Sequence, residues 1–153
     1  MRMGKLAIPT KVIRAGDTVR TLLEECVRAD VGGLPFVDAH GRLSGRASMR
    51  HIMHEHCIPH YTVPAAHFID DHADFPMPDV EVNALLDLPI EPLIIPTVPT
   101  VSFNTPLIKG MAIMEQFSTS YLFLVDDGVY HGVITRMRIA RRILAGSSGD
   151  QHL

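Results

Sequence analysis

Leu34-Pro35-Phe36-Val37-Asp38 is matched by Leu122-Phe123-Leu124-Val125-Asp126, which stands 88 positions later (122 − 34). Further pairs lie 87 positions apart (95 − 8), a difference that one extra residue in a loop explains: Ile8-Pro9-Thr10 with Ile95-Pro96-Thr97, Gly41 with Gly128, Gly45 with Gly132, and Ser48 with Thr135. Self-similarity at a nearly fixed offset is typical of an internal repeat. The sequence therefore predicts a duplicated unit of about fifty residues, too small to bury a comfortable core alone.

The composition narrows the class of protein. The chain has 153 residues, of which 46% are hydrophobic, and its net charge is −3. This acidic balance argues against general nucleic-acid binding, which depends on Lys and Arg neutralising phosphates, so any anion site must be local. No apolar run approaches the roughly 18 residues of a membrane span, so we expect no membrane association. We expect Cys26 and Cys57 to be reduced thiols in a cytoplasmic protein.

The first copy reads as β-α-β-β-α. A short strand is predicted over 11–14, and Thr18 is expected to cap the helix that follows. One helical face carries apolar residues at helical spacing, and the wet face includes Glu25. The residues of the apolar face are Val19, Leu22, Leu23, Cys26 and Val27. Strands are expected over 34–37 and 42–47 around a turn at Gly41, and Ser48 is expected to cap a second helix.

The second copy follows the same order. We expect a strand around 100–102 and a helix opened by Asn104 or Thr105, with Pro106 in its first turn. Strands are predicted over 122–125 and 129–134, and Thr135 is expected to cap the last helix, which Gly146 ends. The apolar face of that helix comprises Ile139, Ala140, Ile143 and Leu144.

Between the copies lies a long segment rich in Pro, His and Asp. A short helix is predicted over 80–88, opened by Met77-Pro78-Asp79 and ended by Pro89. The predicted organisation is a first domain over 1–57, an extended linker over 58–93, a second domain over 94–146 and a frayed tail over 147–153.

Each unit resembles a cystathionine-β-synthase (CBS) domain. The resemblance rests on the two Leu-rich strands quoted above, each followed by a turn glycine and a Gly-x-x-Ser/Thr helix start. In the two copies, that start is Gly45-Arg46-Ala47-Ser48 and Gly132-Val133-Ile134-Thr135. The resemblance implies an α+β fold of two repeats packed sheet to sheet about a pseudo-two-fold axis. It also implies a stand-alone CBS pair of the bacterial type, which forms a homodimer.

CBS pairs typically bind adenosine-containing ligands such as AMP, ATP or S-adenosylmethionine in clefts between the repeats. In the family pattern a Ser or Thr at the helix start approaches phosphate, and an Asp three positions later accepts the ribose hydroxyls. Here the fourth position holds His51 in one copy and Arg138 in the other, and neither replaces that carboxylate. Arginines on these first turns could instead bind phosphate. The candidate ligand-binding residues are Ile8, Thr10, Gly33, Leu34, Pro35, Ser48, Arg50, His51, Ile95, Thr97, Tyr121, Leu122, Thr135, Arg136 and Arg138.

The sequence favours a regulatory module that senses an adenine nucleotide or another anionic metabolite and acts on a partner protein. We expect no catalysis, because no phosphate loop, nucleophile elbow or metalloprotease helix is present. Two alternatives remain open. One is a ligand-free scaffold for dimerisation, in which Ser48 and Thr135 serve as helix caps alone. The other is a metal sensor built on the cluster from His51 to His60, although no metal is expected because its spacing matches no standard zinc pattern.

Overall fold

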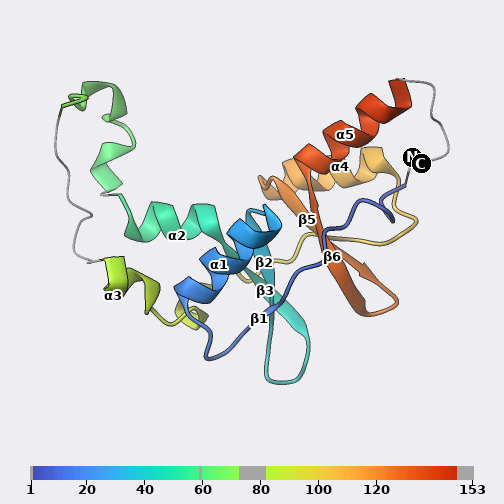
Figure 1. The fold of residues 1–153 in the computed structure, drawn as a ribbon, viewed down its shortest axis with the longest axis horizontal. Coiled ribbons are helices and arrows are strands. Elements are labelled where there is room, and N and C mark those ends of the chain that lie inside the picture. The colour runs from blue at the N-terminus through green and yellow to red at the C-terminus, as the bar shows by residue number, and fades with distance from the viewer. Residues whose placement is uncertain (1, 59, 73–81, 148–153) are drawn as a thin grey trace.

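Two three-stranded sheets, each accompanied by helices, form the centre of the structure (Figure 1). The computed structural model describes residues 2–58, 60–72 and 82–147. Its first half comprises β1 (Ile13–Arg14), α1 (Val19–Ala29), β2 (Gly33–Val37), β3 (Leu43–Ser48) and α2 (Met49–His56). Short helices follow: η1 (His60–Thr62), η2 (Ala66–Phe68), α3 (Val82–Leu86) and η3 (Glu91–Leu93). The second half comprises β4 (Thr100–Val101), α4 (Leu107–Phe117), β5 (Tyr121–Asp126), β6 (Val129–Thr135) and α5 (Arg136–Ser147).

The two sheets have the same topology, which confirms the repeated β-α-β-β-α order. In each, the first strand pairs in parallel with the second, and the second pairs antiparallel with the third. The register also repeats, because Gly33 lies opposite Ser48 in one sheet and Tyr121 lies opposite Thr135 in the other. Gly33 and Tyr121 therefore occupy equivalent positions at the starts of β2 and β5.

The sheets pack against each other, as the resemblance implied. Successive side chains of a strand point to opposite faces, and β5 shows this directly. Tyr121 and Phe123 join the core of the first half, whereas Leu122 and Leu124 join the core formed with the helices of the second half. Each half thus supplies an apolar layer that the other lacks.

The segments flanking the halves are exchanged between the two cores. Met3 and Leu6 are buried in the second core, and the Met3 N–H donates to the carbonyl of Thr105 at 3.1 Å. Conversely, Leu85 and Ile90, which precede the second half, are buried in the first core. Each core is therefore completed by residues from the far side of the repeat boundary.

Two reciprocal backbone pairs join the halves near the pseudo-two-fold axis. Ile8 and Val133 exchange hydrogen bonds of 2.8 and 2.9 Å, and Arg46 and Ile95 exchange two of 2.9 Å. These pairs are equivalent under the repeat, since Ile8 corresponds to Ile95 and Arg46 to Val133. The internal symmetry therefore extends from the sequence to the hydrogen bonds that hold the halves together.

The repeated glycines make this close approach possible. A Cβ on Gly45 would lie 2.7 Å from the carbonyl oxygen of Ile95, and a Cβ on Gly132 would lie 2.4 Å from that of Ile8. Both distances are shorter than any ordinary contact, so a side chain at either position would push apart the backbone pairs that join the two halves. The recurrence of glycine 87 positions apart (132 − 45) follows from this steric requirement.

The apolar face of α1 differs from the one expected. Val27 is 77% exposed, whereas Glu25, assigned to the wet face, is only 4% exposed. The difference has a polar cause, because the Glu25 carboxylate accepts a hydrogen bond from the backbone N–H of Lys11 at 2.6 Å and is paired with Arg28. Burial of this paired carboxylate turns the helix so that Ala29, and not Val27, completes the apolar face.

Several element ends also differ from the expectations. Helix α4 begins at Leu107 after Pro106, because the Thr105 hydroxyl instead accepts the N–H of Ser102 at 2.9 Å. The first strand is shorter than 11–14, and α5 continues past Gly146 to Ser147. Neither Thr18 nor Ser48 caps its helix with a side-chain hydrogen bond.

The expected helix of the linker is present as α3, but it ends at Leu86 and not at residue 88. Its predicted start, residues 77–81, and the tail residues 148–153 lie outside the described residues. Within the described ranges, no helix combines the length and apolar character that crossing a membrane requires.

Candidate functional site

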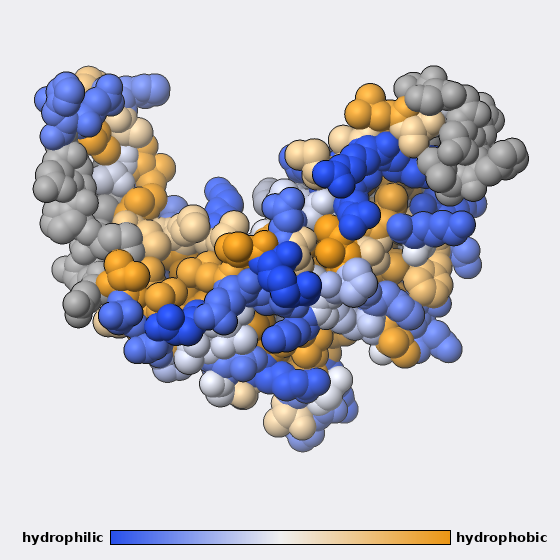
Figure 2. Space-filling view, viewed as in Figure 1, coloured by the Kyte–Doolittle hydropathy of each residue, from blue (hydrophilic) through white to orange (hydrophobic). Residues whose placement is uncertain are grey.

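A cavity of about 820 Å³ lies between the two halves, at the starts of α2 and α5. The space-filling view shows the surface hollowed between these helices (Figure 2). Its wall in the first half comes from the end of β3 and the first turns of α2, and its wall in the second half from the end of α4 and the start of β5. Ile95, which pairs with Arg46 through backbone hydrogen bonds, lines one side.

Arg46 is the most unusual residue of this cleft. It is only 8% exposed, yet its Nε and Nη1 atoms have no hydrogen-bond partner. Its guanidinium lies against two aromatic rings, with Cζ 6.0 Å from the ring centre of Phe117 and 5.8 Å from that of Tyr121. Burying a charged group without hydrogen bonds is costly, and rings alone do not satisfy its N–H donors. The arrangement suits an anion that supplies the missing acceptors.

The rest of the cleft is basic as well. Arg50, Arg136, His51 and His54 also line it, and no Asp or Glu is among the described residues of its wall. Arg136 is partly engaged, since its Nη2 donates to Glu115 Oε1 at 3.0 Å. The net charge of the whole chain is −3, so this positive potential is local, as the sequence required of any anion site.

The start of α2 adds donors to the same place. The helix has no side-chain cap, although the N–H of Met49 donates to the carbonyl of Gly32 at 3.0 Å. First-turn N–H groups have no partner within a helix, and the helix dipole favours negative charge there. An anion held by Arg46 would therefore lie close to a second favourable feature.

Tyr121 shapes the floor of the cleft. A Cβ on Gly33 would lie 2.6 Å from the Tyr121 hydroxyl oxygen, so the ring lies directly against the backbone of its own repeat equivalent. Burial raises the pKa of the Tyr121 phenol, while a hydrogen bond with Ser48 lowers it in part. The phenol therefore stays neutral at physiological pH, and it ties the start of β5 to the start of α2 across the axis.

The structure brings together part of the candidate site. Six of its residues line the cleft: Ser48, Arg50, His51, Ile95, Tyr121 and Arg136. The other nine do not. Leu34 and Leu122 are buried in the cores, Gly33 and Pro35 are strand residues of β2, and Thr97 is an exposed loop residue. Ile8 pairs with Val133, and the Thr135 hydroxyl accepts the N–H of Arg138 at 3.2 Å, which confirms Thr135 as a helix cap.

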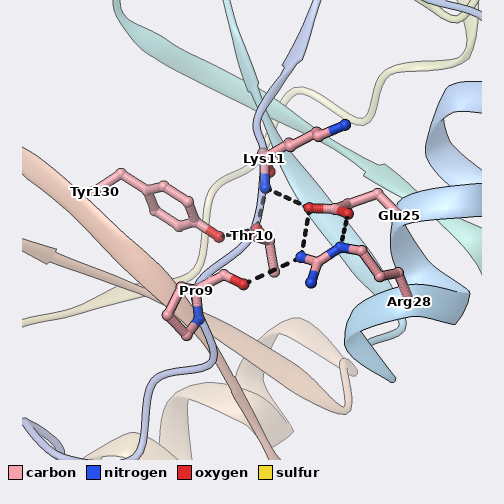
Figure 3. A network of polar contacts seen from close by, with 6 residues as sticks. All are labelled: Pro9, Thr10, Lys11, Glu25, Arg28 and Tyr130. Atoms are coloured by element: carbon pink, nitrogen blue, oxygen red, sulfur yellow. Dashed lines mark hydrogen bonds and ion pairs between the residues drawn. The ribbon is translucent and has the colours of Figure 1, made fainter.

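Thr10 is engaged in a different polar network (Figure 3). Its hydroxyl lies 2.6 Å from that of Tyr130, a contact between the two halves, and the adjacent Lys11 N–H is bound by Glu25. The hydrogen bond with Arg28 holds the pKa of Glu25 below its usual range despite burial, and burial raises the pKa of Tyr130 to about 12. This network holds the segment Pro9-Thr10-Lys11 in place, and the Thr10 hydroxyl is already hydrogen-bonded to Tyr130.

Sequence reasoning missed Arg46, Phe117 and Thr119 among the residues of the cleft. Arg46 stands inside the Gly45-Arg46-Ala47-Ser48 motif, but an arginine in an edge strand reads as solvent-exposed unless the neighbouring half is known. Its equivalent in the second copy is Val133. Together with His51 against Arg138, this difference between otherwise matching motifs indicates that the two copies differ in charge.

Comparison with known proteins agrees with this architecture. Residues 90–145 match the family model of the CBS domain. A CBS-domain-containing protein of unknown function from Kribbella flavida DSM 17836 is 18% identical, with a TM-score of 0.64 over 94% of this chain and 99% of the other. A second, from Bacillus anthracis str. Ames Ancestor, is 15% identical, with a TM-score of 0.64 over 94% and 93%.

A third similar structure is that of CBSX2 in complex with AMP. It is 20% identical, with a TM-score of 0.58 over 95% of this chain and 98% of the other. No curated protein sequence matches the chain. Residues 90–145 are thus similar to a CBS domain, and the whole chain has the fold of CBS-domain-containing proteins, as the repeated motifs indicated.

Proposed function

We propose that this chain is a regulatory module that senses an adenine nucleotide or a related anionic metabolite in the cleft between its repeats. The observation that carries the proposal is the buried guanidinium of Arg46, whose Nε and Nη1 atoms have no hydrogen-bond partner. Arg50, Arg136 and the uncapped start of α2 add further positive potential around it. The complex of the similar protein CBSX2 with AMP supports the adenine nucleotide as the ligand class to test first.

Binding, and not catalysis, is the role that this cleft supports. A ligand held between Arg46 of one half and Arg136 of the other contacts both halves at once, so its binding energy depends on the angle between them. A partner protein in the cytoplasm that contacts both halves could detect that change. His51 takes the place of the ribose-binding carboxylate, so recognition in this proposal rests on phosphate charge more than on the ribose.

A second candidate function, dimerisation, is favoured by a separate observation. An apolar cavity of about 590 Å³ lies between α4 and α5, lined by Ile108, Met111, Ile139 and Ile143 among others. Ile108 is 78% exposed. A second copy of the chain would cover these side chains, and dimerisation is compatible with ligand sensing because the two sites are lined by largely different residues.

The ligand proposal is tested by thermal unfolding of the purified chain with AMP, ADP, ATP, S-adenosylmethionine, adenosine and inorganic pyrophosphate. A ligand at 100 times its Kd adds about 2.7 kcal/mol to the free energy of unfolding, which raises Tm by several degrees. We expect phosphate-containing compounds to raise Tm and adenosine to have little effect. An absence of any shift across the panel would contradict ligand sensing and favour the dimerisation scaffold.

The variant Arg46→Met tests the carrying observation. It should abolish the ligand-induced shift, while the unliganded Tm stays equal or rises, because a buried charge without hydrogen bonds is replaced by an apolar side chain. Arg42→Met, at an exposed position of the β2–β3 turn, is the matched control and should respond like the wild type. A full ligand response in Arg46→Met would remove Arg46 from the site.

A further inference from the structure

Two histidines and a glutamate meet at the end of α2, at the rim of the cleft. His54 Nδ1 lies 3.2 Å from Glu55 Oε1, and His60 Nε2 lies 3.7 Å from Glu55 Oε2. The two imidazole rings are stacked, with centroids 5.4 Å apart and planes inclined by 20°. One ligand atom from each of the three residues can be chosen so that all lie within 4.8 Å of one another.

These distances suit a single metal ion. Ligand atoms on a tetrahedral Zn²⁺ stand about 3.3 Å apart, given Zn–N and Zn–O distances near 2.0–2.1 Å. The 3.2 Å separation runs to Oε1 of Glu55 and the 3.7 Å separation to Oε2, and one ligand atom from each residue lies within 4.8 Å of the others, so side-chain rotations would bring three atoms around one ion. Imidazole nitrogens and a carboxylate oxygen are ligands that Zn²⁺ accepts, and the exposure of all three residues leaves room for water as the fourth.

Metal ligands bind in their deprotonated forms, so Zn²⁺ binding at this site should weaken as pH falls. Cys57, at the end of the same helix, is not in the group, and burial raises the pKa of its thiol.

We propose that His54, Glu55 and His60 form a binding site for one divalent transition-metal ion, with Zn²⁺ as the probe. This ligand set is smaller than the cluster from His51 to His60 that the sequence suggested, and it leaves out His56. Its residues come from the last turn of α2 and the first residue of η1. A bound ion would link α2 to the segment that follows it. The site shares His54 with the wall of the proposed nucleotide site, but its other two ligands, Glu55 and His60, do not line that cleft, whose anchor is Arg46.

The test is equilibrium binding of Zn²⁺ to the untagged chain at pH 7.5, after treatment with a chelator. We expect one ion per chain in the wild type and at least about tenfold weaker binding in His54→Gln and in His60→Gln. Mutating a residue that only hydrogen-bonds to a metal ligand already lowers metal affinity by about tenfold or more, so losing a ligand should lower it at least as much. His56→Gln and His67→Gln are matched controls on the same helix and on η2, and should bind as the wild type does. Circular dichroism of each variant verifies that it is folded.

The substitution of Co²⁺ for Zn²⁺ provides a second readout that does not depend on stability. A tetrahedral site of two imidazoles and a carboxylate gives visible ligand-field bands without a thiolate-to-cobalt charge-transfer band. A strong charge-transfer band lost in Cys57→Ser would overturn this ligand set, as would unchanged Zn²⁺ binding in His54→Gln and His60→Gln. Equal weakening in the His56→Gln or His67→Gln controls, or no stoichiometric binding by the wild type, would overturn the proposed site.

Discussion

Glu25 shows how one residue can outweigh a hydrophobic pattern. Helical spacing places Val27 inside and Glu25 outside, yet the structure has the reverse, because the carboxylate binds the Lys11 N–H and Arg28. The exposed side chain of Arg28 covers the buried carboxylate from outside. The Glu25 carboxylate thus links helix α1 to the backbone at Lys11, just before β1, and Val27 is exposed instead of buried.

The first prediction concerns Glu25→Gln, which should lower the free energy of unfolding at pH 7 by about 1.5–3 kcal/mol, the range for hydrogen bonds to charged groups. The pKa of Glu25 is lowered in the folded state, so its contribution is present above pH of about 4.5 and is lost as pH falls through the folded pKa. Urea unfolding from pH 3 to 7 should therefore show the wild-type and variant curves converging in acid. The exposed neighbour Glu24 provides the control Glu24→Gln, and curves that stay parallel would contradict this account.

At the scale of elements, the order of strands and helices was predictable and their ends were less so. Buried strands such as Leu34 to Val37 carry their signal in a few adjacent residues, and the repeat gives each signal twice. The start of α4 was not predictable, because Thr105 had two local partners available and its hydroxyl binds Ser102, leaving Pro106 to open the helix. The spacing of hydrophobic residues does not show which of two nearby backbone groups a side-chain hydroxyl will bind.

The second prediction concerns the backbone pair between Ile8 and Val133 that joins the two halves. Gly132→Ala should destabilise the chain by about 1–3 kcal/mol, because its Cβ would lie 2.4 Å from the backbone oxygen of Ile8, a residue held in place by two hydrogen bonds with Val133. Gly110→Ala is the contrast, since the atoms nearest its Cβ are side-chain atoms, the end of Met3 at 2.5 Å and Leu122 at an ordinary 3.5 Å, and alanine gains up to about 1 kcal/mol in a helix. Chemical denaturation of both variants measures the difference. Equal effects would show that the close approach at Ile8 is not a constraint.

At the scale of the whole molecule, the repeat predicted the packing of the two halves, and the resemblance predicted that a cleft lies between them. Neither the repeat nor the resemblance predicted that Met3 would be buried in the second core or that Arg46 would lie against Phe117 and Tyr121. Both contacts join residues more than seventy positions apart (117 − 46), and no local pattern encodes such pairs. Four of the six candidate ligand residues that line the cleft stand at helix starts, which carry a local sequence signal: Ser48, Arg50, His51 and Arg136. The central arginine, Arg46, carries no such signal.

The exposed apolar face of α4 and α5 carries the prediction for the assembly. If a second copy covers this face, Ile108→Lys and Ile143→Lys should each convert a dimer into a monomer, because a lysine in a desolvated apolar interface lacks a partner. Size-exclusion chromatography with light scattering measures the mass directly. Val27→Lys, at a 77% exposed position on α1, is the matched control. A wild-type chain that is monomeric at high concentration would contradict the dimer.

The exchanged flanks have a consequence for how the protein is made. Met3 leaves the ribosome more than a hundred residues before Leu122 and Ile134, its neighbours in the second core (122 − 3). The first core must likewise wait for Leu85 and Ile90. Neither core can therefore be completed until residues from the far side of the repeat boundary have been synthesised, and until then Met3 and Leu6 lack their neighbours in the second core.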